Sequence, residues 1–414
     1  MINLNKTDVI KIFGVVALFY PVLILTGPFL PDLFIVASIF LIFLSKLQLN
    51  LKFIFKNYYL IFLFWILCVI SSILSEQIYF SFKSSFFYIR FFLYSCFIWY
   101  LLREKYLNLK SLIYIMYIVY LFLIFDSHFQ YIFNFNVFGM ITESKMRISS
   151  IFGSELIMGS FLLRTFPVFI ALLLAYNKDN LLLIIPLIYS SIILSGERTT
   201  IFLSIIFLLV LLKIEISNKK KIVNFFLIII VFLSHFFFNE NFNYNLTDRM
   251  KEEVTFNIDI KKNIDNEGEY KKVLPFKIFT DNHTRIYNTS YLMFLDNKIF
   301  GQGANNFRKK CFNYDPKACT THPHNHLFQI LSEVGLLGFF LYLVIFITIL
   351  KKLFKEFFDK RKLSCVRFIL LLSIVINFFP FLPSGNFFNN YLNIMMYFPV
   401  GFYLYYGNIN REQK

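Results

Sequence analysis

Three histidines alternate with other residues in the run His322-Pro323-His324-Asn325-His326, which stands directly before a long apolar segment. The apolar segment predicts a helix, so His324 is expected at or just before the N-terminus of that helix. The positive end of a helix dipole disfavours an additional proton, and a neutral imidazole is therefore expected at pH 7. A neutral imidazole can accept a proton from an attacking hydroxyl group. The run therefore predicts a general base at His324.

The neighbours of this histidine have expected roles of their own. Pro323 fixes the backbone that leads into the helix, and Asn325 caps the helix or orients the imidazole. His322 and His326 are expected to support the base or to lie at the surface. The three alternating histidines also fit a zinc site, but Pro323 and the lack of a clear fourth ligand argue against one. We therefore predict no metal and no other cofactor.

The helix that follows carries three more residues of interest. Glu333 is expected roughly two and a half turns from His324, where it would pair with an arginine rather than perform catalysis. Gly335 and Gly338 are expected on one helix face, where they allow a neighbouring helix to approach closely. Their predicted role is packing rather than phosphate binding.

The elements that position these residues are predicted to be membrane helices. Of the 414 residues 57% are hydrophobic and 16% are charged, whereas soluble domains contain about 25% charged residues. The apolar runs are long enough to cross a hydrocarbon core of about 30 Å, and they lack the alternation of barrel strands. The first run is interpreted as an uncleaved span, because no A-x-A-like site follows it. The sequence thus predicts an all-α polytopic membrane protein with about twelve transmembrane helices, near residues 9–26, 29–45, 57–75, 86–102, 109–127, 156–176, 181–195, 199–214, 221–238, 327–350, 363–382 and 391–407.

The net charge of +16 follows this topology. With the N-terminus in the cytoplasm, nearly all of the basic excess falls in the inside loops and ends, in patches such as Lys219-Lys220-Lys221 and the segment from Lys351 to Lys362. This is the positive-inside pattern of a polytopic membrane protein. It argues against a nucleic-acid partner and predicts that both termini are cytoplasmic.

One long polar stretch divides the chain into three expected parts. Residues 1–238 would hold spans one to nine, residues 239–326 a large periplasmic loop domain between the ninth and tenth spans, and residues 327–414 spans ten to twelve. A loop of this length is uncommon and is usually functional. Its first half, residues 239–270, is expected to be mobile. In its second half, a helix is expected to begin at Asp281 and to end at the turn Gly301-Gln302-Gly303.

Two cysteines and three histidines outside the motif need an interpretation. Cys311 and Cys319 both lie in the predicted outside loop, where oxidising conditions permit a disulfide, and they are expected to pair. His128, His235 and His283 are interpreted as having no role in function.

The motif spacing resembles that of a known family. His324-Asn325, nine residues, Gly335, two residues and Gly338 match the signature of the O-antigen ligase and polymerase superfamily, which is a His followed by Asn, Ser or Gln and then by two spaced glycines. The arginine-bearing turn Ser195–Thr200 resembles the same family, and so does the order Arg285, Gly301-Gln302-Gly303, Asn306-Phe307. By motif the resemblance covers about residues 190–340. It implies a metal-independent bacterial membrane glycosyltransferase.

The resemblance also implies substrates and roles. A glycan would move from undecaprenyl or another polyprenyl diphosphate to a sugar hydroxyl of lipid A-core, or of another glycan, at the periplasmic face. His324 would be the base. Arg198 and Arg285 would bind the diphosphate, because an arginine presents a planar and permanently charged fork to phosphate. The alternatives are a snorkelling anchor for Arg198 and a surface salt bridge for Arg285.

Two other functions stay open. An O-antigen or exopolysaccharide polymerase would join lipid-linked repeat units to one another. A flippase or transporter of the lipid-linked glycan would need charges inside the membrane, and Arg90 and Arg164 are the features that favour it. These two arginines either bind substrate or pair with an acid, for which Glu76, Glu143 and Glu155 are the candidates.

Overall fold

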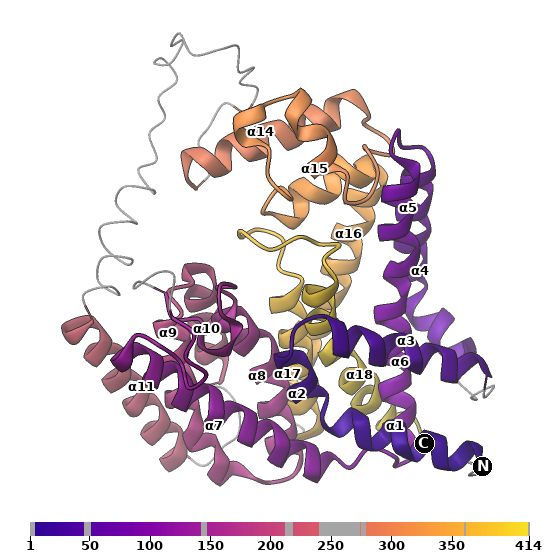
Figure 1. The fold of residues 1–414 in the computed structure, drawn as a ribbon. Coiled ribbons are helices and arrows are strands. Elements are labelled where there is room, and N and C mark those ends of the chain that lie inside the picture. The colour runs from indigo at the N-terminus through magenta and orange to yellow at the C-terminus, as the bar shows by residue number, and fades with distance from the viewer. Residues whose placement is uncertain are drawn as a thin grey trace.

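The computed structural model describes residues 5–44, 51–141, 147–211, 218–239, 274, 279–359 and 362–412. Over these ranges the chain is helical and contains no strand, in agreement with the predicted all-α class (Figure 1). Residues 240–270 of the predicted mobile segment lie outside the described residues, and so do Glu143 and the side chains of Lys219 to Lys221.

The N-terminal part of the chain supplies most of a helical bundle. Its helices are α1 (Lys6–Leu18), α2 (Tyr20–Leu25), α3 (Phe29–Leu44), α4 (Leu51–Ile73), α5 (Ile78–Phe86), α6 (Arg90–Arg103), α7 (Leu109–Phe133), α8 (Met158–Ala175), α9 (Ile185–Leu194), α10 (Arg198–Leu211) and α11 (Asn218–Phe238). The C-terminal part contains α14 (Asp281–Asp296), α15 (Phe307–Lys310), α16 (His326–Phe358), α17 (Lys362–Asn377) and α18 (Asn390–Glu412).

Each predicted span overlaps one or more helices of the structure, and the first, 9–26, is divided between α1 and α2. Four helical segments are long and apolar enough to cross a membrane, namely Ile78–Arg103, Leu109–Phe133, Met158–Ala175 and His326–Phe358. Shorter apolar helices occupy Phe29–Leu44, Tyr58–Ile73, Leu181–Leu194, Arg198–Val210, Ile222–Phe237 and Leu363–Asn377. The number of crossings, the three-part division and the side on which the long loop lies remain predictions.

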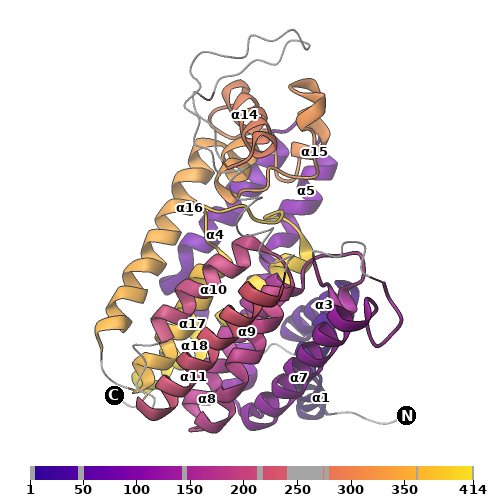
Figure 2. The same ribbon diagram turned by 90° about the vertical axis from the view of Figure 1, so that its left-hand side faces the viewer.

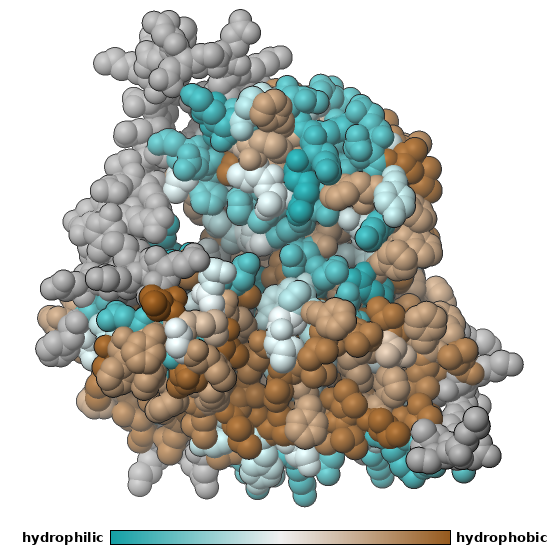
Figure 3. All heavy atoms as spheres, in the orientation of Figure 1, coloured by the Kyte–Doolittle hydropathy of each residue, from teal (hydrophilic) through white to brown (hydrophobic). Residues whose placement is uncertain are grey.

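The surface of the molecule is divided into bands. Figure 3 shows a broad hydrophobic belt over the bundle, with hydrophilic side chains above it around α14 and α15 and a thinner hydrophilic rim at the opposite end. In Figures 1 and 2, α14 and α15 form a cap over one end of the bundle, and α16 runs from this cap along the bundle. An apolar belt between two polar ends is the surface that a bilayer requires.

The cap and the bundle have separate hydrophobic cores. The bundle core is continuous through the helices that pack around α17, which contacts α8, α16 and α18. The cap core is smaller and includes Tyr287, Met293 and Phe307. The structure joins Cys311, which belongs to this core, to Cys319 in a disulfide with Cα atoms 5.0 Å apart.

The predicted helix after Asp281 is α14, with small differences at its ends. Its N-cap is Thr280, whose side-chain oxygen accepts a hydrogen bond from the backbone N–H of His283. The helix ends at Asp296, before the glycine turn, and Gly301 and Gly303 of that turn contact the backbone of α16 instead.

That contact corrects the predicted role of the glycines in α16. Gly335 has φ 76° and ψ −169°, so α16 is interrupted there rather than continuous. A Cβ on Gly335 would lie 2.3 Å from the carbonyl oxygen of Ile299, and one on Gly301 would lie 2.5 Å from the carbonyl carbon of Glu333. Gly335 therefore packs against the backbone of a loop and not against a helix. Gly338 meets the side chain of Val334 in its own helix.

Candidate functional site

The histidine run adopts a defined conformation before α16. Asn325 is the N-cap, and its Oδ1 accepts hydrogen bonds from the N–H groups of Leu327 at 2.9 Å and Phe328 at 3.2 Å. His324 has a positive φ of 57°, which turns the chain immediately before the cap. Satisfying two free N–H groups of the first turn is the usual function of an Asn in this position. The geometry thus agrees with the capping role predicted for Asn325.

The loop between α17 and α18 holds this run in place. The backbone N–H of Ser384 donates to the carbonyl of His324 at 2.8 Å, and Nε2 of His322 donates to the carbonyl of Ser384 at 3.3 Å. Because Nε2 of His322 carries the proton, its Nδ1 accepts from the hydroxyl of Thr321 at 2.9 Å when the ring is neutral. Asn325 also donates to the carbonyl of Leu382 at 3.4 Å.

Three imidazole rings meet beside the cap. The ring centroid of His324 lies 4.0 Å from that of His322 and 6.1 Å from that of His283, which comes from α14. The interpretation of His283 as a residue without a role therefore overlooked its position beside the candidate base. No local pattern could reveal it, because this contact joins residues about forty positions apart. Within the described ranges, no three His, Cys, Asp or Glu side chains are grouped so that they could hold a metal ion.

Both motif histidines outside the helix favour the neutral form. Burial is the largest cause that lowers the pKa of His324, and the nearby charge of His283 adds to it. Burial, followed by the charge of His324, lowers the pKa of His322 to about 3. A neutral His324 agrees with the expected protonation state, but its main cause is burial rather than the helix dipole.

His326 is the first residue of α16 and is only 1% exposed, so it is not a surface residue. Its ring stands edge-on to Phe387, with the centroids 5.3 Å apart. Neither ring nitrogen has a hydrogen-bond partner in good geometry, although the backbone of Gly385 lies close enough to interact.

Glu333 is fully buried at the end of the first segment of α16 and does not pair with an arginine, contrary to the prediction. Its carboxylate accepts hydrogen bonds from the N–H groups of Asn305 and Phe307, both at 2.9 Å, and from Nε2 of Gln329 at 3.0 Å. Gln329 also donates to Oδ1 of Asn386 at 2.7 Å. Glu333 therefore connects α16 to the loop before α15 and, through Gln329, to the loop before α18.

Arg285 and Arg90 each form an ion pair with an aspartate. Arg285 makes a two-pronged pair with Asp315, in which one guanidinium nitrogen lies 2.8 Å from Oδ1. Arg90 pairs with Asp32 at 3.0 Å and 3.2 Å rather than with Glu76 or Glu155, the two considered acids that the structure describes. One of these acids, Glu76, pairs with Lys310 instead.

Arg198 begins α10, directly after a turn that is bound to the start of α8. The carboxylate of Glu197 accepts from the N–H and hydroxyl of Ser160, at 3.1 Å and 2.6 Å, and from the hydroxyl of Thr200 at 3.0 Å. The turn also accepts a hydrogen bond from Arg147, which donates to the carbonyls of Ser195 at 3.4 Å and Leu156 at 3.0 Å. The sequence analysis passed over Arg147, a second cation at this turn.

Arg164 lies in α8 and is held from α17. One of its terminal nitrogens donates to the carbonyl of Asn377 at 3.1 Å and to the side-chain oxygen of Asn377 at 3.0 Å. Its charge acts on both Glu197 and His326. The arginine turn and the histidine motif, which are far apart in the sequence, are therefore linked in space through Arg164.

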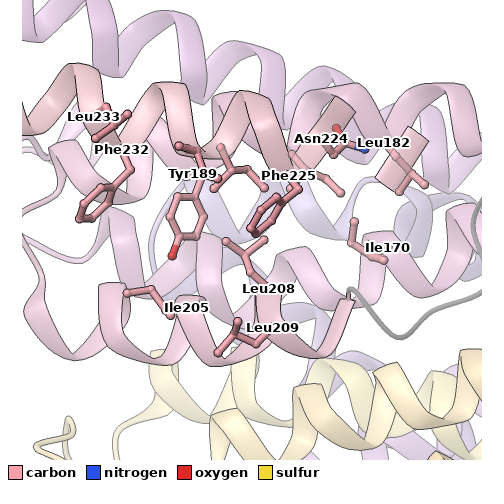
Figure 4. Close-up of a pocket in the computed structure, with 13 residues that line it drawn as sticks. Ile170, Leu182, Tyr189, Ile205, Leu208, Leu209, Asn224, Phe225, Phe232 and Leu233 are labelled. Atoms are coloured by element: carbon pink, nitrogen blue, oxygen red, sulfur yellow. The ribbon is translucent and has the colours of Figure 1, made fainter. Parts of the chain in front are cut away.

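A cavity of about 240 Å³ lies between α8, α9, α10 and α11 (Figure 4). Apolar side chains such as Ile170, Leu208 and Phe232 form nearly all of its lining, and Tyr189 and Asn224 are the polar exceptions. The hydroxyl of Tyr189 accepts a hydrogen bond from Ser204 at 3.2 Å, whereas Oδ1 of Asn224 has no partner. The cavity suits hydrocarbon rather than sugar.

The fold and the site define an all-helical membrane protein with a neutral histidine at a helix N-terminus beneath a polar cap. Residues 181–343 match the family model described as O-antigen ligase, and this match supports a resemblance of the chain to the O-antigen ligase superfamily. The match includes Arg198, Arg285, His324 and both motif glycines, and it supports a membrane enzyme of the ligase or polymerase type. No curated protein matches the sequence.

Proposed function

We propose that this protein is an O-antigen ligase. It would transfer a glycan from polyprenyl diphosphate to a sugar hydroxyl of lipid A-core at the periplasmic face of the bacterial inner membrane, with both termini in the cytoplasm. The observation that carries the proposal is His324, a largely buried imidazole whose pKa is lowered and whose backbone is fixed by the loop at Ser384. Such a ring is ready to accept a proton at neutral pH.

His324 and the nearby arginines can account for both the proton and the leaving group of the proposed reaction. The acceptor hydroxyl oxygen forms a bond to the anomeric carbon and gives its proton to His324. The bond from that carbon to the diphosphate oxygen breaks, and its electron pair stays on the diphosphate. Fixed cations stabilise this growing negative charge. Arg198 is the proposed cation at the turn, and Arg285 contributes less, because Asp315 already neutralises part of its charge.

The apolar cavity beside α10 supports a lipid-linked substrate. Its lining resembles the interior of a bilayer, so a hydrocarbon chain there loses no hydrogen bonds. No metal takes part in the proposed reaction.

The test uses purified full-length protein in lipid, polyprenyl diphosphate-linked glycan, and lipid A-core present or absent, with the products separated on a gel. Glycan is expected on lipid A-core with the wild-type protein and with the control variant His128→Ala. It is not expected with His324→Ala, which should reach the membrane at the normal level. Transfer by His324→Ala would refute the assignment of the base. A ladder of lengthening glycan without lipid A-core would make the protein a polymerase.

A further inference from the structure

A disulfide ties the segment that carries the histidine motif to the cap. Cys311 belongs to the cap core and is fully buried, whereas Cys319 is partly exposed and lies three residues before His322. A chain extends by at most about 3.6 Å per residue, so the backbone of His322 stays within about 11 Å of this tether. The disulfide thus limits the positions that the motif can take.

The cap side of the disulfide is anchored to α14. Asp315 lies within the loop that the disulfide closes, is buried, and forms the ion pair with Arg285 of α14. Tyr287, also from α14, stacks on Phe328 of α16 with the ring centroids 4.5 Å apart. This stacking joins α14 to α16 without the two cysteines. The disulfide loop is therefore fixed to a helix that has contacts of its own.

Hydrogen bonds extend from the other side of the disulfide to the motif. The hydroxyl of Thr320 donates to the carbonyl of His322 at 2.8 Å, and the hydroxyl of Thr321 lies 2.9 Å from Nδ1 of the same residue. The ring of His322 lies beside that of His324, with the centroids 4.0 Å apart. A short path thus leads from Cys319 to the candidate base.

We propose that the disulfide between Cys311 and Cys319 positions His324 for the reaction, so that the protein becomes active only after the two thiols are oxidised. The inference rests on the proposed function, because the role of His324 as a base comes from it. The two cysteines are positioning residues that act through the segment 320–323. In the reduced protein this segment keeps its hydrogen-bonding groups but loses its covalent tether, so the imidazole can occupy more positions.

The oxidation needs a partner that carries a disulfide. The thiolate of Cys319 attacks one sulfur of the partner's disulfide, because Cys311 is fully buried, and the thiolate of Cys311 then displaces the partner from the mixed disulfide. The two thiols of the protein lose two electrons and two protons, and the partner gains them and becomes a dithiol. Such partners act in oxidising compartments, and the cap is proposed to lie in one.

The experiment compares the oxidised and the reduced protein. Full-length wild-type protein in lipid nanodiscs is measured as purified, after reduction by dithiothreitol, and after reoxidation by oxidised glutathione, with the reagents removed each time. The double variant Cys311→Ser/Cys319→Ser cannot form the disulfide, and Cys365→Ser removes a cysteine outside it as the matched control. Three quantities are followed: glycan transfer to lipid A-core, the reaction of His324 with diethyl pyrocarbonate, and amide hydrogen exchange.

Reduction is expected to lower kcat for transfer about 10- to 100-fold, because the base is misplaced, and to change KM little. Burial lowers the pKa of His324 from 6.5, so the pH midpoint of its reaction with diethyl pyrocarbonate should rise toward 6.5 when the segment loosens. At short labelling times, amide exchange should rise in residues 320–325 while α14 stays protected. Reoxidation should reverse all three changes. The double variant should behave like the reduced protein, and Cys365→Ser like the oxidised wild type.

The same transfer rate and the same reactivity of His324 in the oxidised and reduced protein overturn the inference. Loss of protection in α14 at short labelling times also overturns it, because the disulfide then maintains the whole cap rather than the position of the base. The two proposals fail separately. Redox-dependent reactivity of His324 in a protein without transfer activity refutes only the ligase proposal. Transfer that depends on His324 but not on the disulfide refutes only this inference.

Discussion

Substitution of Gly335 by alanine tests the interruption of α16 directly. The backbone there has φ 76° and ψ −169°, a region that is nearly exclusive to glycine and costs another residue about 1–3 kcal/mol. The new Cβ would also lie 2.3 Å from the oxygen of Ile299, so the loop at residues 298–303 must move away.

That movement breaks the hydrogen bonds that satisfy the interruption. The N–H groups of Gln302 and Gly303 donate to the carbonyls of Ser332 and Glu333 at 2.9 Å and 2.8 Å, and the N–H of Leu336 donates to Lys298 at 2.8 Å. Each contributes about 0.5–1.5 kcal/mol net. Strain and lost hydrogen bonds together predict a destabilisation of roughly 3–7 kcal/mol for Gly335→Ala.

Gly338→Ala is the matched control. Gly338 has no positive φ, and its added Cβ would meet the side chain of Val334 rather than backbone. Alanine is favoured over glycine within a helix by about 1 kcal/mol, which offsets the crowding. Thermal unfolding of both purified variants should show a large loss for Gly335→Ala and little change for Gly338→Ala. Equal losses of stability in the two variants would refute the interruption of α16 at Gly335. They would favour the original prediction that both glycines pack on one face of a continuous helix.

Three further predictions concern the base and the cap. Transfer needs neutral His324, whose pKa is lowered from 6.5, so activity should persist below pH 6.5 and fall only when the pH drops through that lowered pKa. The variant His283→Asn removes the charge that helps to lower the pKa of His324, so that pKa should rise. The acid limb of the pH–rate profile should then move to higher pH. An acid limb at the same pH would exclude electrostatic coupling between His283 and His324. Cys311 and Cys319 should resist alkylation in unreduced membranes and react after reduction, and Cys311→Ser should cost about 2–3 kcal/mol of cap stability for a separation of 8 residues. Free thiols before reduction would contradict the disulfide.

Features that depend on neighbouring residues were predictable from the sequence. The apolar runs predicted the helices correctly. A membrane helix satisfies its backbone N–H and C=O groups within its own segment, so its formation depends little on contacts with distant residues. The cap at Asn325 was predictable for the same reason, since its oxygen reaches N–H groups only two and three residues away. The helix at α14 was also correct, apart from its end.

Contacts between distant segments were not predictable. Arg90 finds Asp32, which is 58 residues away, because α3 and α6 pack together, and nothing near Arg90 in the sequence favours that acid over three others. His283 reaches His324 only because α14 folds over the start of α16. Gly335 was predicted to lie inside a helix, because a single glycine in an apolar run does not by itself indicate a break in the helix. The break depends on the loop at residues 298–303, whose contact with Gly335 the sequence does not reveal.

The interruption at Gly335 bears on how the histidine motif is positioned. It divides α16 into a short first segment that carries the motif and a longer segment that runs along the bundle. The short segment is held by the backbone of the 298–303 loop, by Glu333 through Asn305 and Phe307, and by Gln329 through Asn386. A continuous helix would move His324 whenever its membrane part moved, whereas the interrupted helix lets cap and inter-helix loops fix the base independently. Gly335, together with Glu333, which lies between it and His324, therefore helps to position the imidazole.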